Sequence, residues 1–365
     1  MIFLTRRTAI TAMAATALLA PVPAALAADP KPDDIAKVLA GIKPAADSPL
    51  AGLASDPAFQ RHAARLDTSW KNVDQRQLSK IRAWSAANLP ARKPTVFYFF
   101  SGPDFLYANA FLPDATTYVF AGLEPVGRLP NLAELPKRTV ASAYDEINAK
   151  IGTVLNYSFF ITKEMQEKFR SGAARGALPI LSVFLARWGK TITDVAYVSI
   201  DSDGKEQPLA NPDATGPANG VKISFKGESG KAQTLYYFST NLNNAGVKSS
   251  GFLKFAQALG PADSFVKSAS YLMHDNNFST VREFLLENSA TLTQDDSGVP
   301  VRFFASDKWT LKPFGNYVGP ISLFAGNNQP QLKQLFVSAK APRIDFGIGY
   351  RWRPNETNLL LAIKK

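Results

Sequence analysis

Two apolar runs with a short helical stretch between them constrain the fold of this chain most. The run PTVFYFFSG, residues 94–102, is continuously apolar between a proline and a glycine, which is typical of a strand buried on both faces. DFLYANAFL, residues 104–112, has helical character, and TTYVFAGL, residues 116–123, is a second buried-strand candidate. A strand, a helix and a strand within about 30 residues predict a βαβ unit with two parallel strands.

The rest of the chain adds antiparallel strands and helices. Residues 220–240 predict an antiparallel hairpin, and residues 192–201 predict a further strand. Apolar side chains alternate through 346–352 (FGIGYRW), which predicts one face of a strand paired with NLLLAI at 358–363. Thr280 and Glu283 fit a capping box at the start of a helix. We therefore expect an α/β fold, a mixed sheet with a βαβ core and antiparallel additions.

The domain organisation is expected to follow composition along the chain. Residues 28–92 predict a loose lead-in and a helical segment, because apolar residues recur there at spacings of three and four. Residues 93–365 predict the mixed α/β body, which the helical segment precedes. The stretch 211–220 is rich in proline, asparagine and glycine, so a domain boundary or a long loop within one domain remain alternatives.

The N-terminus has the pattern of an export signal. Two arginines at 6–7, a mildly apolar run at 9–20 and an A-x-A site at 25–27 predict a signal peptide over residues 1–27 and a mature start at Ala28. The arginine pair favours the twin-arginine route, but an alanine stands where that motif usually has phenylalanine, so the ordinary secretory route stays open. We expect a periplasmic or secreted protein with no membrane-spanning segment after cleavage.

Composition limits the chemistry available to the chain. It contains no cysteine, which excludes disulfides, thiolate metal sites and a cysteine nucleophile, and its two histidines are too few for a multi-histidine metal site. The formal net charge is +11, and loss of Arg6 and Arg7 with the signal would leave +9. Such a surface favours anionic envelope polymers or lipid head groups as partners, and export disfavours nucleic acid. A charge that serves solubility alone is the alternative.

The turn after the first buried strand resembles a cofactor-binding turn only in part. Glu124 lies roughly 20 residues beyond Gly102, the offset at which dinucleotide sites place an acidic residue on a ribose. However, the turn has a single glycine, Pro103 lacks an N–H group, and Asp104 would repel a pyrophosphate. We therefore expect no cofactor and interpret Asp104 as the N-cap of the following helix.

Acidic residues at predicted strand ends are the main candidates for a site. Asp104 and Glu124 each follow a buried strand, as do Asp295 and Asp296 in the sequence TQDDSG. His274 lies between an apolar run and a helix, where α/β enzymes place functional groups. Converging carboxylates could bind Ca²⁺ or Mg²⁺ or divide the acid and base roles of glycoside cleavage, although no metal-ligand set can be assigned. Capping and turn formation are the alternative roles of these aspartates, and a hydrogen-bonded structural or surface histidine is the alternative for His274.

Ser264 and His62 are two further residues with reactive side chains. Ser264 and Lys267 match the S-x-x-K pattern of serine acyl-enzymes, but the companion motifs are missing, which argues against a nucleophilic Ser264. His62 falls on a basic helix and is expected to be solvated.

Three short stretches carry a resemblance to other proteins. FSGPDF, QDDSG and FGIGYRW resemble segments of uncharacterised exported bacterial proteins, over roughly residue 94 to the C-terminus. The resemblance implies a bacterial, exported origin and no activity.

Two functional hypotheses follow from these patterns. The first is an exported protein that binds an anionic envelope or extracellular ligand without catalysis, on the basis of the signal and the net charge. The second is a cofactor-independent glycan or ester hydrolase that uses the strand-end carboxylates and His274. Whether the protein is an enzyme stays open, and the distances between these side chains distinguish the hypotheses.

Overall fold

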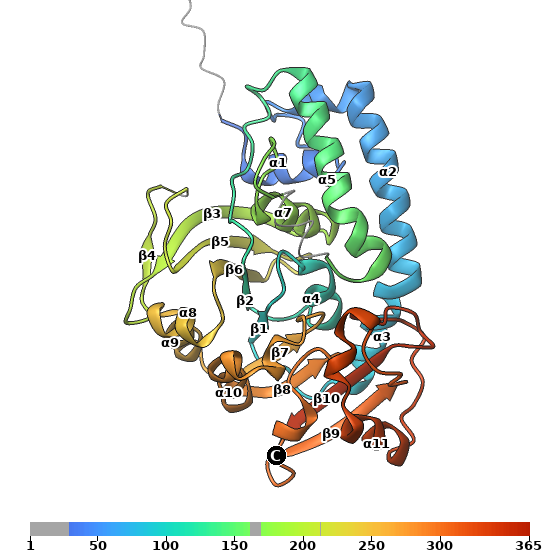
Figure 1. Ribbon diagram of the computed structural model, residues 1–365. Helices are drawn as coiled ribbons and strands as arrows, with labels where there is room; N and C mark the ends of the chain where they lie inside the picture. Colours follow the sequence, from blue (N-terminus) through green and yellow to red (C-terminus); the bar gives the residue numbers. More distant parts are fainter. Residues whose placement is uncertain (1–28, 161–168, 212) are drawn as a thin grey trace, which may run out of the picture.

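The computed structural model describes residues 29–160, 169–211 and 213–365, and it has a large mixed β-sheet at its centre (Figure 1). The predicted signal peptide therefore lies outside the described residues. Ten described strands form the sheet: β1 (Thr95–Phe99), β2 (Thr117–Gly122), β3 (Thr191–Ile200), β4 (Glu206–Pro208), β5 (Ala218–Lys226), β6 (Ala232–Thr240), β7 (Ala262–Val266), β8 (Ser289–Gln294), β9 (Trp309–Gly315) and β10 (Asn358–Lys364).

The strand order is β4-β3-β5-β6-β2-β1-β7-β8-β10-β9, and it divides into a parallel centre and antiparallel flanks. Strands β6, β2, β1, β7 and β8 all run parallel to their neighbours within this group. On one side β5, β3 and β4 continue antiparallel, and on the other side β10 and β9 do. The predicted α/β class, with its βαβ core and antiparallel additions, is confirmed.

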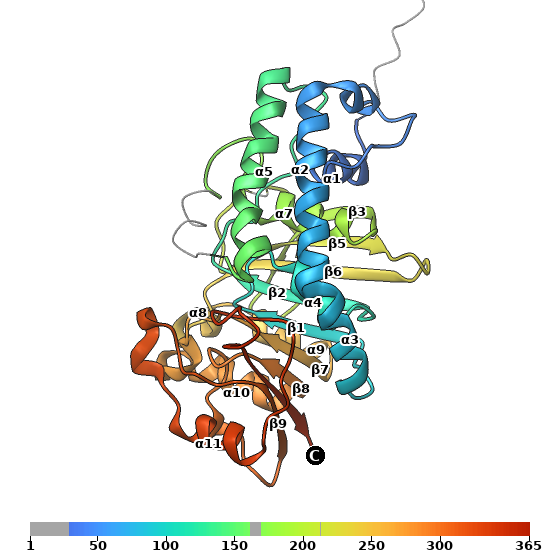
Figure 2. The ribbon, with the colours of Figure 1, turned by 90° about the vertical axis from the view of Figure 1, so that its right-hand side faces the viewer.

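Helices cover both faces of the sheet. The first set, which shares one hydrophobic core with the sheet, comprises α1 (Pro32–Leu39), α2 (Pro57–Val73), α3 (Ser79–Asn88), α4 (Phe105–Phe111), α5 (Lys137–Tyr157) and α7 (Ala177–Arg187). The second core, on the other face, contains residues of α8 (Asn244–Ser249), α9 (Phe252–Ala258), α10 (Ser279–Asn288) and α11 (Pro330–Ser338). Figure 2 shows the long helices α2 and α5 side by side. Among the described helices, none has the length and apolar character needed to cross a membrane.

Strand β1 shows why its sequence is continuously apolar. Tyr98 packs into the core of the first helix set, whereas Phe97 and Phe99 pack into the core on the opposite face. All five residues of the strand are buried. Because helices cover both faces, a polar residue on either face of β1 would lose its hydration without compensation, which explains the absence of alternation.

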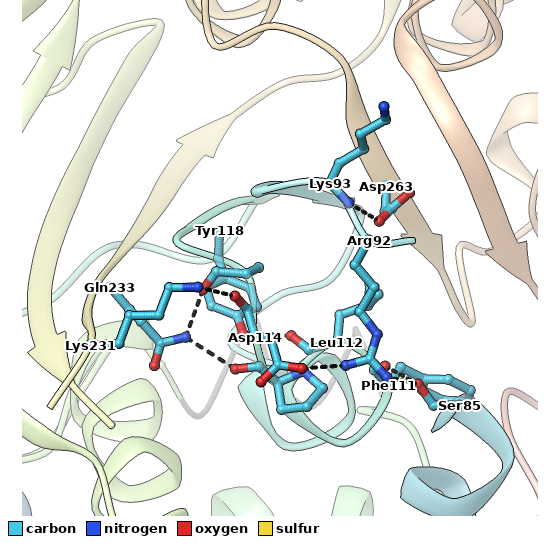
Figure 3. Close-up of polar contacts among 12 residues, drawn as sticks. Ser85, Arg92, Lys93, Phe111, Leu112, Asp114, Tyr118, Lys231, Gln233 and Asp263 are labelled. Carbon is cyan, nitrogen blue, oxygen red and sulfur yellow. Dashed lines mark hydrogen bonds and ion pairs between the residues drawn. The ribbon is translucent and has the colours of Figure 1, made fainter. Parts of the chain in front are cut away.

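Polar contacts tie together the edge of the sheet where the parallel strands begin (Figure 3). Arg92 donates to Asp114 at 2.7 Å, which joins the segment before β1 to the segment before β2. The Gln233 amide, near the start of β6, donates to the carbonyl of Ala115 at 2.6 Å. The backbone N–H of Lys93 donates to the Asp263 carboxylate of β7 at 2.7 Å. Side chains therefore fill and cross-link this amino edge.

Two local predictions near the C-terminal part are wrong. Residues 346–352 form no strand, and an isolated bridge joins Ile348 to Arg351. The expected partner, β10, instead pairs with β8 and β9, so both of its edges are occupied. Thr280 does not cap α10, because the helix begins at Ser279 and the Asn244 side chain accepts from the Thr280 N–H at 3.0 Å.

The hairpin prediction is confirmed, since β5 and β6 pair antiparallel over their whole length. Of the stretch 211–220, residues 211 and 213–217 lie between β4 and β5, residues 218–220 belong to β5, and both strands belong to the same sheet. The division of the chain into domains stays a prediction.

His62 is buried, contrary to the expectation that it is solvated, and its side chain is 4% exposed. Its Nε2 bonds to the Leu39 carbonyl of the α1 end at 2.9 Å, and its Nδ1 faces the Asn148 amide of α5 at 3.0 Å. The ring stacks on Tyr144 with centroids 4.5 Å apart. A neutral ring with its hydrogen on Nε2 satisfies both contacts. The solvated prediction failed because the basic residues beside His62 gave no sign that α1 and α5 would cover this face of α2.

We predict that His62 makes the fold sensitive to acid. Burial, together with the nearby Arg187 and Arg65 cations, lowers its pKa from 6.5 to about 4, so its contribution to stability is present above pH 6.5 and is lost as pH falls toward 4. Protonation in the folded state costs on the order of 3 kcal/mol. The free energy of unfolding of the unaltered protein, measured by urea titration, should exceed that of the His62→Gln variant at pH 7. This gap between the two free energies should be smaller at pH 4.5. The raised pKa values of buried carboxyls affect both proteins alike, so a gap that stays constant with pH would contradict the prediction.

Candidate functional site

The carboxyl ends of the parallel strands meet at one edge of the sheet. From β1 the chain passes through α4 to β2 on one side, whereas β7 lies on the other side of β1. The strand order therefore reverses between β1 and β7. In open α/β sheets, ligands bind outside the carboxyl ends of the strands at such a switch point.

All five residues predicted from the sequence lie near this edge. Asp104 follows β1, Glu124 follows β2, and Asp295 and Asp296 directly follow β8. His274 ends a 3₁₀ turn, Leu272–His274, in the connection after β7. The structure nevertheless distributes them over different environments, so they do not form a single constellation.

Asp104 belongs to a buried ion pair. Its carboxylate lies 3.0 Å from the Lys267 ammonium, and the two side chains are 1% and 2% exposed. The Tyr98 hydroxyl donates to the same carboxylate at 2.7 Å, and the Tyr107 N–H donates at 3.2 Å, which confirms the predicted N-cap. Lys267 also donates to the carbonyl of Ser158. Burial raises the pKa of Asp104, and the Lys267 charge opposes that rise.

Asp295 and Asp296 are also held inside the protein. Asp295 accepts from the N–H and the hydroxyl of Ser297 at 3.1 and 2.5 Å, and from the Ser268 N–H at 3.1 Å. Asp296 accepts from the Tyr271 hydroxyl at 2.8 Å and from the Asn358 amide at 3.1 Å. Burial and the neighbouring Asp295 charge raise the pKa of Asp296 to about 6. All four carboxylate oxygens have partners, so these aspartates join the ends of β7, β8 and β10.

Glu124 differs from the three aspartates because it lines a crevice. The crevice has a volume of about 120 Å³ and lies across the ends of β6, β2, β1 and β7. Burial raises the pKa of Glu124, and the Tyr237 hydroxyl donates to its carboxylate at 3.2 Å. A Cβ atom at Gly122 would lie 2.4 Å from the Glu124 Oε2 atom, and one at Gly102 would lie 3.5 Å from it. The two glycines thus leave room for the carboxyl group. We call this hollow the switch-point crevice.

The backbone around the switch-point crevice is strained. Phe100, at the end of β1, has φ +62°, and Ser268, Ser270 and Tyr271, after β7, have φ values of +53°, +51° and +56°. Such angles are uncommon outside glycine and cluster at functional sites. The Ser268 hydroxyl oxygen is buried and has no hydrogen-bond partner among the described residues. Phe100, Ser268 and Ser270 all line the crevice.

His274 does not line the crevice. Its ring packs against the Tyr271 ring with centroids 5.1 Å apart, and its Nε2 is buried without a partner among the described residues. Burial and the Arg302 charge lower the pKa of His274 to about 4, so the ring is neutral at pH 7. It could act as a base only if a substrate reached it.

The predicted carboxylates do not form a cation site. Within the described ranges, no group of three histidine, aspartate or glutamate side chains is arranged to hold a metal ion. The three aspartates instead use their oxygens for internal hydrogen bonds, as the capping alternative expected.

Sequence reasoning missed Lys267 and Ser268, which follow β7. Lys267 contacts Asp104, and Ser268 lines the crevice. The signal was a lysine directly after the buried strand ADSFV, where a charge needs a partner. In the sequence, Lys267 stands out only as the last residue of the S-x-x-K pattern. Ser264 of that pattern is buried and its hydroxyl bonds to the Ser289 hydroxyl at 2.6 Å, so it is a structural residue.

We predict that Lys267→Met destabilises the protein by about 3–5 kcal/mol, because it leaves the Asp104 charge buried without its partner. Asp104→Asn keeps the N-cap but leaves the lysine unpaired, and it should also destabilise. The double variant should lose clearly less than the sum of the two single variants. Urea unfolding at pH 8 measures the free energies, and strict additivity would show that the two charges do not interact.

Comparison with known proteins does not assign the chain to a family. No protein-family model matches the chain. Neither a curated protein nor a solved structure matches it either.

Proposed function

We propose that the protein binds a small, largely apolar molecule in the switch-point crevice, with Glu124 as its polar contact. The observation that carries the proposal is the combination of a carboxyl group, an unpartnered serine hydroxyl and strained backbone around one hollow at the switch point. The aspartates that the sequence suggested are internal supports, and they hold the loops that shape this hollow.

The lining of the crevice indicates the chemical class of the ligand. Phe100, Leu123, Leu242, Leu272 and Phe278 make it mainly apolar. Glu124 is the single charged side chain among the described lining residues. A hydrogen-bond donor or an amine on the ligand would pair with this carboxyl group, whereas an anion would meet no compensating charge. The anionic ligand expected from the net charge is therefore not assigned to this crevice.

Hydrolysis is the second candidate function. The unpartnered Ser268 hydroxyl lies in a left-handed turn directly beyond a central strand, and burial raises the pKa of Glu124. Glycoside cleavage, however, needs two carboxyl groups about 5–10 Å apart across the substrate, and the described lining of the crevice offers one. Binding without catalysis is the simpler function for this lining.

We predict that the crevice discriminates three benzyl compounds by their polar group. Benzylamine should bind more tightly than benzyl alcohol, and benzoate should bind least, because Glu124 is the one charge in the described lining. Glu124→Gln should weaken benzylamine binding about tenfold and leave benzyl alcohol nearly unchanged. Isothermal titration calorimetry measures the three affinities.

Glu134→Gln is the matched control, because Glu134 is exposed and lies outside the crevice lining. Equal affinity for benzoate and benzylamine, or no binding of any of the three probes, would refute the proposal. A chromogenic ester and glycoside screen separates the second candidate, because turnover that Ser268→Ala abolishes would require catalysis.

We also propose that the protein is exported to the periplasm or the medium, on the basis of the arginine pair and the A-x-A site at the N-terminus. Mass spectrometry of the protein from a periplasmic extract should give a chain that starts at Ala28. Lysine at both Arg6 and Arg7 should stop export by the twin-arginine route and leave secretory export intact. Full-length protein confined to the cytoplasm would contradict export.

A further inference from the structure

A second hollow, of about 440 Å³, lies between the end of β9, the helix α11 and the segment that follows α11. Lys333 and Lys340, from α11 and the turn after it, and Arg343 line the hollow together with Phe336, Val337 and Tyr317. Strands β8 and β9 both run antiparallel to β10, so β9 ends at the same edge of the sheet as β8. We call this site, defined by its three cations, the basic hollow.

The three cations form no ion pair with a carboxylate in the described part of the chain. No described carboxylate lies within 4.0 Å of Lys333, Lys340 or Arg343, and no lining residue of the hollow is acidic. By contrast, the nearby Arg351 and Arg353 both lie within 4.0 Å of Glu356. Like charges that line one hollow without compensation repel each other, and an anion between them would relieve that repulsion.

The local backbone gives no structural reason for two of these charges. Lys333 lies in the first turn of α11, where the positive end of the helix dipole disfavours a cation. Lys340 has φ +47°, in the left-handed position after the helix that glycine or asparagine normally occupies. A lysine there costs conformational energy, so a role for its side chain is the better explanation. Helix capping alone would explain neither residue.

We propose that the basic hollow binds the phosphate group of an organic phosphate ester. Three cations are enough to neutralise a phosphate monoester, whose charge is about −2 at pH 7, and lysine and arginine are the side chains that bind phosphate. Val337, which is 71% exposed, supplies apolar surface for the organic part, and the largely buried rings of Tyr317 and Phe336, with centroids 6.1 Å apart, form the apolar wall behind it. The hydroxyl of Tyr317 already contacts Asn328 and the Gln329 N–H. The site is independent of the switch-point crevice and of its ligand.

Two probes distinguish a soluble ester from a lipid-borne one. Phenyl phosphate in isothermal titration, with phenol as the uncharged control, represents a soluble ester. Flotation with vesicles of phosphatidylcholine, with and without phosphatidylglycerol, represents a lipid. At low ionic strength we expect the protein to bind phenyl phosphate, phosphatidylglycerol vesicles or both. The probe that binds identifies the source of the phosphate.

The variant Lys333→Gln, Lys340→Asn, Arg343→Gln should weaken that binding about 100-fold, at roughly fivefold per cation. Asparagine suits the left-handed backbone at position 340, so the melting temperature should not fall. The matched control is Arg138→Gln, Lys226→Gln, Lys248→Gln, which removes the same charge from exposed positions outside the hollow. The control should retain binding within a few-fold. Equal loss in both triple variants, or no binding of either charged probe by the unaltered protein, would overturn the proposal.

Discussion

Burial of the parallel strands on both faces restricts charged side chains to the ends of the strands. Along β1 and its neighbours every face packs against helices, so a charge is tolerated where a strand stops. Lys267 directly follows β7, and Asp104 follows β1 at the start of α4. The two side chains form a buried ion pair, which offsets the loss of hydration of both charges. This pair holds the end of β7 beside the start of α4, and it thereby supports the loops that form the switch-point crevice.

The two edges of the sheet differ in how their polar groups are used. At the amino edge, side chains such as Arg92, Gln233 and Asp263 bond to the neighbouring segments and close the surface. At the carboxyl edge, the aspartate carboxylates accept hydrogen bonds from groups inside the protein. The Ser268 hydroxyl, however, has no partner among the described residues, and Glu124 lines the switch-point crevice. Unused hydrogen-bonding capacity next to strained backbone is what a ligand can exploit.

Local patterns predicted the fold where a segment's own neighbours determine its structure. The apolar run of β1, the hairpin of β5 and β6 and the Asp104 cap all depend on residues close in sequence. The alternation at 346–352 failed because β10 pairs with β8 and β9, a choice that involves segments far away in the chain. Periodicity describes which side chains are buried and does not name the partner strand.

The same limit applies to the candidate site. The sequence placed Asp104, Glu124 and Asp295 at one edge of the sheet because each of them follows a strand. It did not indicate which side chains would contact these carboxylates. Lys267 meets Asp104 only because β7 pairs with β1, across more than half of the body of the chain. Whether a strand-end carboxylate is a support or faces a hollow depends on such non-local contacts.

A positive net charge and a crevice with one carboxyl group are compatible because electrostatic selectivity is local. In water containing salt, interactions between exposed charges weaken within about 10 Å, so distant lysines do not set the preference of a hollow. The switch-point crevice has Glu124 as its single described charge, while the basic hollow has three cations. If both sites are occupied, one edge of the sheet recognises two chemically opposite groups, and the overall charge would predict only the second.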